Sequence, residues 1–300
     1  MNSQSATVIG LSIAGISAAL RLADAGQGVN LFEIENDLAL REQFEVSGTA
    51  LANDAIRGAD FEDIARSVLA KSGIALAAGI VFQQAVPKGA GLGLVVKRGA
   101  RELEVELERS SKVIYSPNGV PLVSPLLEKP NFSRALGRGL SMSASADASF
   151  FKGRKAAVIG NSRWTVEQAR FAAEFASVVK IIVEGENLIS GSKLIIPGCK
   201  EEVEVIPHSH VIDLKVSAEG KVLGIIYETP GGLRTDEIDV VFLATDIQPD
   251  WGQVGGEETA RKLNSQGVLC LSGVANSIPY NAYAELAEDG IRAAQALLLD

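Results

Sequence analysis

The pattern of hydrophobic and polar residues repeats one arrangement twice along the chain. A short apolar run at Thr7–Ile9 turns through glycine into an amphipathic stretch over residues 13–25, and a second apolar run covers 29–32. The same order returns over residues 155–183. A strand, a glycine turn, a helix and a second strand form the βαβ unit of nucleotide-binding domains. The pattern therefore predicts an α/β chain with two Rossmann-like nucleotide-binding domains.

Between and after these units the pattern predicts further strands and helices. Residues 61–72 have the spacing of an amphipathic helix that ends before Gly73. Alternating apolar and polar residues over 80–115 predict antiparallel strands that end at Val113–Tyr115. Additional strands are expected at 202–206, 222–227 and 239–243, followed by a looser segment and a last helix at 281–299.

The first glycine turn carries most of the dinucleotide-binding fingerprint G-x-G-x-x-G. Gly10 and Gly15 fill the first and third glycine positions, Ser12 stands at the second, and Ile13 and Ala14 complete the motif. In this fingerprint the first glycine makes the turn, the second admits a pyrophosphate, and the third lets helix and strand pack closely. The helix N-terminus also offers free N–H groups to an anion. We predict a dinucleotide here; the alternative is a fold that kept its shape and lost its ligand.

Glu33 ends the second predicted strand, 18 residues beyond Gly15. A carboxylate at about this distance accepts hydrogen bonds from the ribose hydroxyls of a bound dinucleotide. Gly10, Gly15 and Glu33 together therefore predict one continuous nucleotide site.

The second glycine turn is poorer in glycine. It retains Gly160, its Ser162 and Thr165 are small and polar, and its Trp164 is bulky for a phosphate-binding loop. Glu184 ends the next strand, where an NADP site would need arginine for the 2′-phosphate. These residues predict that NADH is a possible ligand and that NADPH is disfavoured. The alternative is a Rossmann-like domain that binds no nicotinamide nucleotide.

At this point the order of segments resembles the low-molecular-weight thioredoxin reductases, which are pyridine nucleotide-disulfide oxidoreductases, over nearly the whole chain. The first glycine turn and Glu33 are similar to the FAD end of that family. Residues 139–153 resemble the family segment that carries C-x-x-C-D before F-F-x-G-K, with Asp147 in the place of its acid. The two family cysteines fall on Ser143 and Ala146. The frame of the motif is present, and its redox-active pair is absent.

The resemblance also implies the domain organisation. It implies a discontinuous FAD-binding domain made of residues 1–117 and 243–300, an inserted NAD(P)-binding-like domain at 118–242, and a homodimer. It adds Gly273 and Ala282 to the residues expected near FAD.

Other motifs of the family are changed in this chain. The A-T-G hinge falls on Ser116-Pro-Asn, the late G-D falls on Ser272-Gly273, and the NADPH-binding H-R-R falls on Val183-Glu-Gly. The start of the last helix resembles the family segment that packs against the isoalloxazine. Tyr280 and Tyr283 in this segment either cover a flavin or pack in the core.

Composition and charge exclude several classes of partner. The net charge is -9 and the pI is about 5.0, whereas a nucleic-acid-binding protein more often shows a basic face. The sequence has no basic amphipathic helix for an anionic membrane, no apolar stretch of the roughly 20 residues that a span needs, and no signal peptide. We expect a cytoplasmic protein with no nucleic-acid or membrane partner.

The cysteines and histidines do not form a metal or redox centre in the sequence. Cys199 and Cys270 are 71 positions apart in apolar surroundings, which is typical of buried free thiols. His208 and His210 share one face of a strand, but nothing completes a metal site, so a surface pair is expected. Ser143 has no identifiable base, so no catalytic residue is predicted.

Two functions stay open at this stage. The first is an FAD-dependent oxidoreductase without redox-active cysteines, which passes electrons from a reduced nucleotide or a protein donor to a non-disulfide acceptor. That acceptor is a small molecule or an electron-transfer protein. The second is a non-catalytic homodimer that binds a nucleotide or another ligand in the flavin cleft of this fold. Gly10–Gly15 and Glu33 favour the first, whereas Ser116-Pro-Asn and Ser272-Gly273 favour the second.

Overall fold

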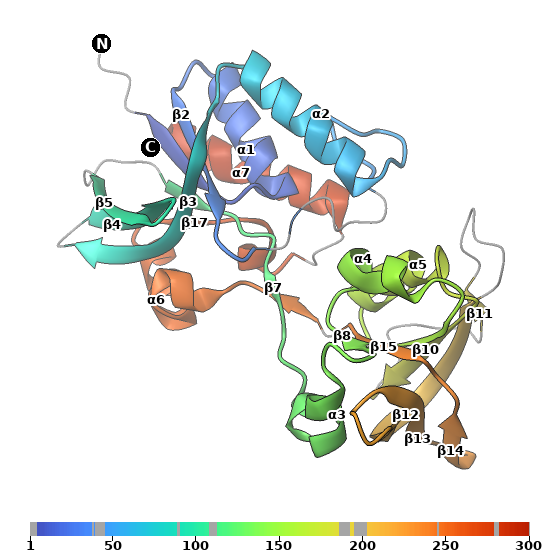
Figure 1. The fold of residues 1–300 in the computed structure, drawn as a ribbon. Coiled ribbons are helices and arrows are strands. Elements are labelled where there is room, and N and C mark those ends of the chain that lie inside the picture. Colours follow the sequence, from blue (N-terminus) through green and yellow to red (C-terminus); the bar gives the residue numbers. More distant parts are fainter. Residues whose placement is uncertain are drawn as a thin grey trace. The chain divides into compact units, whose positions relative to one another are not determined.

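A computed structural model describes residues 5–37, 39, 46–88, 91–107, 113–185, 193–194, 203–244, 246–278 and 282–299 (Figure 1). The chain forms two compact units, one of Met1–Val120 with Gln248–Asp300 and one of Pro121–Ile247. The first unit therefore combines both ends of the chain, and the second is one continuous insertion. The two crossing segments pair with each other as β7 (Val120–Pro121) and β16 (Ile247–Gln248).

The first unit is built on a seven-stranded sheet with the order β17-β6-β1-β2-β3-β4-β5. β1 pairs in parallel with β2 on one side and with β6 on the other. Every residue of β1 and β6 is buried, as expected for short apolar runs inside a parallel sheet. The strands are β1 Ala6–Ile9, β2 Val29–Ile34, β3 Ala75–Lys88, β4 Gly91–Arg98, β5 Arg101–Leu107, β6 Val113–Tyr115 and β17 Cys270–Leu271.

The α-helices described in the first unit are α1 (Ile13–Asp24), α2 (Gly58–Lys71), α6 (Glu257–Ser265) and α7 (Tyr283–Leu299). α1 and α7 lie side by side (Figure 1). Their close approach needs Gly290, because a Cβ there would overlap the carbonyl oxygen of Ala14. α6 buries Ala260 and Leu263 in an apolar cluster that also contains Phe82.

The second unit is built on an eight-stranded sheet, whose path runs β14-β13-β12-β10-β9-β15-β8 while β11 pairs with β12. β9 lies between β10 and β15, and all three are parallel. β12, β13 and β14 pair in antiparallel fashion. The strands are β8 Leu140–Ser141, β9 Lys155–Ile159, β10 Val178–Glu184, β11 Lys193–Leu194, β12 Val203–Val216, β13 Val222–Thr229, β14 Gly232–Asp236 and β15 Val240–Leu243.

Helices α3 (Pro130–Ala135), α4 (Ala144–Asp147) and α5 (Arg163–Ala173) belong to the second unit. α5 connects β9 to the parallel strand β10, so this unit repeats the βαβ arrangement of β1, α1 and β2. The prediction of an α/β chain with two Rossmann-like units is confirmed. Among the described residues, no helix is both long and apolar enough to cross a membrane.

Three local predictions were wrong. β6 is parallel to β1 rather than part of an antiparallel series, because it returns to the centre of the sheet instead of extending the hairpins. The segment predicted to be loose contains α6. β2 continues to Ile34, so Glu33 is its penultimate residue rather than its last.

Candidate functional site

The glycines of the first turn are required by the chain itself. Gly10 has a φ of +114°, and a Cβ at this residue would overlap the carbonyl oxygen of Ser116. A Cβ at Gly15 would overlap the carbonyl oxygen of Gly10. The N–H of Ser116 in turn donates to the carbonyl oxygen of Ile9 at 2.7 Å. The turn therefore seats α1 directly against the ends of β1 and β6.

Ser12 is the N-cap of α1, and its hydroxyl makes two contacts. Its Oγ accepts from the N–H of Gly15 at 2.9 Å and lies 2.8 Å from the Oγ of Ser116. Ser12 is 4% exposed, Ile13 is 1% exposed and Ala14 is fully buried. The chain's own hydroxyls therefore stand where a pyrophosphate meets this turn in dinucleotide-binding proteins.

Glu33 lines a cavity of about 140 Å³ with Leu11, Asn118 and other residues of the first unit. Its Oε1 accepts from Nη2 of Arg66 at 2.5 Å. Nε of the same guanidinium donates to Oε1 of Glu62 at 2.9 Å. Burial of the guanidinium works against its charge, but the hydrogen bonds to Glu33 and Glu62 outweigh it, and the pKa of Arg66 is raised. The predicted ribose-binding acid is thus present, solvent-accessible and held in an ion pair.

Asp37, from the loop after β2, binds the backbone near the crossing between the units. Its two carboxylate oxygens accept from the N–H groups of Asn118 at 2.7 Å and Gly119 at 2.6 Å. The side-chain amide of Asn118 donates to the carbonyl oxygen of Leu11 at 3.2 Å. These bonds tie the segment that follows β6 to the loops that follow β1 and β2.

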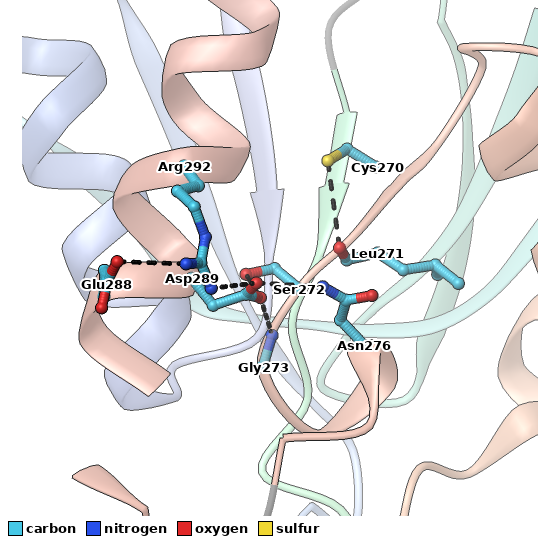
Figure 2. Close-up of polar contacts among 8 residues, drawn as sticks. All are labelled: Cys270, Leu271, Ser272, Gly273, Asn276, Glu288, Asp289 and Arg292. Atoms are coloured by element: carbon cyan, nitrogen blue, oxygen red, sulfur yellow. Dashed lines mark hydrogen bonds and ion pairs between the residues drawn. The ribbon is translucent and has the colours of Figure 1, made fainter. Parts of the chain in front are cut away.

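Asp289 of α7 organises the segment where the family resemblance expects a flavin contact (Figure 2). Its carboxylate accepts from Ser272 Oγ at 3.0 Å, from the N–H of Gly273 at 2.8 Å and from Asn276 Nδ2 at 2.9 Å. Asp289 is only 4% exposed, and Arg292 lies 3.4 Å from it. These three donors therefore bind a carboxylate of the chain itself rather than a ligand.

The neighbouring residues that the resemblance singled out have structural roles where they are described. Ala282 is 7% exposed, and its carbonyl oxygen accepts from the N–H of Leu286 in the first turn of α7. Tyr283 is the first residue of α7. Tyr280 lies outside the described residues.

Cys270 is a free, partly buried thiol in β17. Burial, and to a lesser extent the negative charge of Asp289, raise the pKa of this thiol to about 11. A thiol with such a pKa is almost entirely protonated at neutral pH and is a poor nucleophile. Cys199 lies outside the described residues.

The segment that resembles the dithiol motif forms α4 and the loop before it. Ser143 is the N-cap of α4, and its Oγ accepts from the N–H of Ala146 at 3.3 Å. Asp147 accepts from Ser141 Oγ at 2.7 Å, which is a local role that holds the loop. The N–H of Ala144 donates to the side chain of Gln168 on α5. The motif's frame is kept, and its two cysteine positions carry no thiol.

The glycine turn of the second unit is also closed by the chain itself. A Cβ at Gly160 would overlap both the carbonyl oxygen of Ala244 and the hydroxyl of Thr165. Thr165 is fully buried, and its Oγ1 donates to the carbonyl oxygen of Ala244 at 3.0 Å. The same Oγ1 accepts from the N–H of Ser162 at 3.1 Å. The buried Trp164 is part of the unit's interior rather than of an open loop.

Glu184 ends β10 and contacts β12. Its Oε1 accepts from the N–H of Val211 at 3.2 Å and lies 3.6 Å from Nδ1 of His210. His208, Ser209 and His210 line an open cavity of about 400 Å³ beside Gly185. Within the described part of the chain, no three metal-binding side chains cluster.

Comparison with known proteins now identifies the fold. No family model matches the chain. The thioredoxin reductase of Aquifex aeolicus is 28% identical over 121 residues, so this chain spans 36% of the length of that curated relative and matches it over 37% of its own. The solved thioredoxin reductases of T. acidophilum and Lactococcus lactis cover 99% of this chain and 98% of their own, with TM-scores of 0.75 and identities of 20% and 17%. The chain therefore has the fold of the solved thioredoxin reductases.

The resemblance to thioredoxin reductases implies FAD, and the first unit fits the adenosine half of FAD better than its flavin half. Glu33 lines a sugar-sized cavity beside the N-terminus of α1, which suits a ribose next to a phosphate. Gly273 has no side chain to reach a ribityl chain, and its N–H is bound by Asp289. The fit therefore supports residue assignments for the adenosine half alone.

Sequence reasoning missed four residues of this candidate site: Asp37, Arg66, Ser116 as a partner of Ser12, and Asp289. One signal was available, since Glu62 and Arg66 have the i, i+4 spacing of a helical ion pair. The other pairings join residues distant in sequence, such as Ser12 and Ser116.

Proposed function

We propose that this chain is a flavoprotein oxidoreductase of thioredoxin reductase fold that binds FAD in its first unit and works without a redox-active dithiol. The observation that carries the proposal is Glu33, whose carboxylate lines a cavity beside the Gly10–Gly15 turn. A carboxylate here accepts ribose hydroxyls, and the adjoining helix N-terminus favours a phosphate.

Bound FAD would supply electron-transfer chemistry, and the chain's residues would bind and orient it. Glu33 accepts the ribose hydroxyls. The hydroxyl of Ser12, which is bonded to that of Ser116 in the structure, donates to the pyrophosphate once that bond opens. Asp37 keeps the segment at Asn118 close to the turn.

The acceptor in this proposal is not a disulfide. Dithiol exchange needs an attacking thiolate and a second thiol, and the corresponding positions are Ser143 and Ala146. Electrons therefore pass directly to a small molecule or to an electron-transfer protein. The donor is a protein or a reduced nucleotide, and NADH is preferred to NADPH because Glu184 would repel a 2′-phosphate.

Cofactor content tests the proposal directly. The purified protein should be yellow and should release FAD on denaturation. Glu33→Ala should lower its affinity for FAD by about tenfold or more. Glu104→Ala, which removes an exposed carboxylate of β5 that pairs with Lys88 of β3, should not lower it. A protein that is colourless after incubation with FAD contradicts the proposal.

Two assays test the proposed electron donor and the proposed electron acceptor. Flavin reduction should be faster with NADH than with NADPH, and the reverse order would refute the role of Glu184. Reduction of thioredoxin or DTNB should be negligible. Robust turnover that disappears in the double variant Cys199→Ser, Cys270→Ser would place a redox pair elsewhere in the chain.

A non-catalytic ligand-binding protein is the second candidate, and Asp289 favours it. The carboxylate binds the loop donors of Ser272 and Gly273, which in a flavoprotein of this fold would lie near the cofactor. This candidate predicts a protein that binds an adenine nucleotide and stays colourless. Nucleotide titration of the protein as purified, read beside its absorbance spectrum, separates the two functions.

The assembly and location of the protein are proposed from the family resemblance. We expect a homodimer that acts in the cytoplasm, with neither nucleic acid nor membrane as a partner. Light scattering at micromolar concentration should give the mass of two chains, and the mass of one chain, 31.5 kDa, would contradict the dimer.

A further inference from the structure

Arg66 holds the proposed ribose-binding acid from one side of the cavity. Its Nη2 binds Glu33 while its Nε binds Glu62, so one planar guanidinium spans two carboxylates. Glu62 is 4% exposed in its side chain, whereas Arg66 and Glu33 are 39% and 40% exposed. The buried carboxylate anchors the guanidinium, and the guanidinium in turn fixes the accessible carboxylate.

The charge around the cavity is one-sided. Glu33, Asp37 and Glu62 contribute three carboxylates against the single guanidinium of Arg66 among the described lining residues. Two of those carboxylates bind that guanidinium, and the third binds the N–H groups of Asn118 and Gly119. An incoming phosphate on the ribose would therefore meet a cation already bonded to two acids, together with a net negative wall.

We propose that Arg66 is a positioning residue that orients Glu33 toward a ribose 2′-hydroxyl, so that the cavity selects adenine nucleotides with a free ribose diol and rejects those with a 2′-phosphate. Arg66 engages Oε1 of Glu33, and the ribose hydroxyls take Oε2. A carboxylate has room for several donors, so the ion pair and the ribose contacts are compatible. The inference deepens the proposed function, because it names the specificity of the same site.

Lysine cannot replace Arg66 in this role. A guanidinium presents donors in a rigid fork, whereas an ammonium is a single point of charge. In Arg66→Lys the ammonium holds at most one of the two acids firmly, and Glu33 loses its fixed orientation. The effect should therefore appear in selectivity for the 2′ position more than in overall binding.

Three nucleotides matched at their 5′ end test the proposal: AMP, 2′-deoxy-AMP and adenosine 2′,5′-bisphosphate. Binding is measured on the full chain, as purified and after removal of any cofactor, by ligand-observed NMR or calorimetry. We expect AMP to bind about tenfold more tightly than either analogue, because one good hydrogen bond or one unfavourable charge contact has about that weight. Equal or tighter binding of the bisphosphate overturns the proposal, as does an absence of AMP binding at millimolar concentration.

The variants separate positioning from folding. Arg66→Lys and Arg66→Met should shrink the ratio between AMP and 2′-deoxy-AMP toward one, while Arg261→Met, which removes an exposed helical ion pair with Glu257, should leave it unchanged. If Arg66 has a purely structural role, its loss would weaken the binding of both nucleotides equally and leave the ratio of their affinities unchanged. That result would refute the proposal. Thermal unfolding of each variant confirms that the chain is folded at the assay temperature.

The outcomes also distinguish this inference from the proposed function. Selective AMP binding by a protein that never retains FAD keeps the specificity of the cavity and removes the flavoprotein proposal. If the protein retains FAD but binds AMP and its two analogues with equal affinity, the flavoprotein proposal stands and the role of Arg66 is refuted.

Discussion

Removal of the Asp289 carboxylate should destabilise the first unit severely. In Asp289→Ala the N–H of Gly273 and the hydroxyl of Ser272 both lose their acceptor, and both residues are buried. Each buried donor left without a partner costs on the order of 1–3 kcal/mol, so the expected loss is roughly 2–6 kcal/mol. Asn276 is exposed and turns to water, and the ion pair with the half-exposed Arg292 contributes little.

The assay has to report the first unit alone, because a chain of two units need not unfold in one step. The chain has two tryptophans, Trp251 in the first unit and Trp164 in the second. Urea unfolding in a Trp164→Phe background therefore follows the first unit through Trp251. The free energy of unfolding is compared among variants made in that same background.

Two neighbouring substitutions serve as controls for this prediction. Asp289→Asn keeps the shape and one oxygen for the two buried donors, so the expected loss is about 1 kcal/mol. Glu288→Ala removes an exposed carboxylate paired with Arg292 and should change stability by no more than about 0.5 kcal/mol. If Asp289→Ala is no more destabilising than Glu288→Ala, the loop does not depend on this carboxylate and the reasoning is refuted.

The remaining predictions concern a thiol and the two glycine turns. In a Cys199→Ser background, Cys270 should react with iodoacetamide at pH 8 about two orders of magnitude more slowly than a model thiol, and its rate should rise until about pH 11; a plateau by pH 9 would contradict the raised pKa. The same shift favours the protonated thiol in the folded chain, so stability should fall as pH rises from about 9 to about 11. Gly15→Val should give no soluble protein. Gly26→Ala, where a Cβ meets open space and the only cost is the strain of a φ of +78°, should still give soluble protein. Thr165→Val should cost the second unit about 1–3 kcal/mol in urea unfolding followed by the tryptophan of that unit, and a change within error would show that its hydroxyl bonds are not needed.

Elements with strong local periodicity were predictable from the sequence, and elements defined by distant partners were not. α1, α2, α5 and α7 each present an apolar stripe at helical spacing. α6 is nine residues long, and its apolar face consists of Ala260 and Leu263 among mostly polar neighbours, which is too little to mark a helix in the sequence. β6 is a run of three apolar residues, and only its pairing with β1 makes it parallel.

The candidate site divides in the same way. Gly10, Gly15 and Glu33 could be found because a known spacing joins them along the chain. Arg66 is 33 residues from Glu33, and the Ser12 hydroxyl meets one 104 residues away. Such contacts depend on how the strands are ordered in the sheet, which the spacing of residues along the chain does not determine.

The glycine turns of this chain are evidence for its fold rather than for a bound ligand. Gly10, Gly15 and Gly160 each leave room for a backbone carbonyl oxygen of the chain itself, so a protein of this fold needs them with or without a bound dinucleotide. Evidence for a ligand comes instead from residues that the fold itself does not require. Glu33 is the clearest of them, because its carboxylate reaches a cavity and is 40% exposed. The choice between a flavoprotein and a colourless nucleotide-binding protein therefore depends on whether the ligand of the Glu33 cavity carries a flavin, and the absorbance spectrum read beside the nucleotide series decides it.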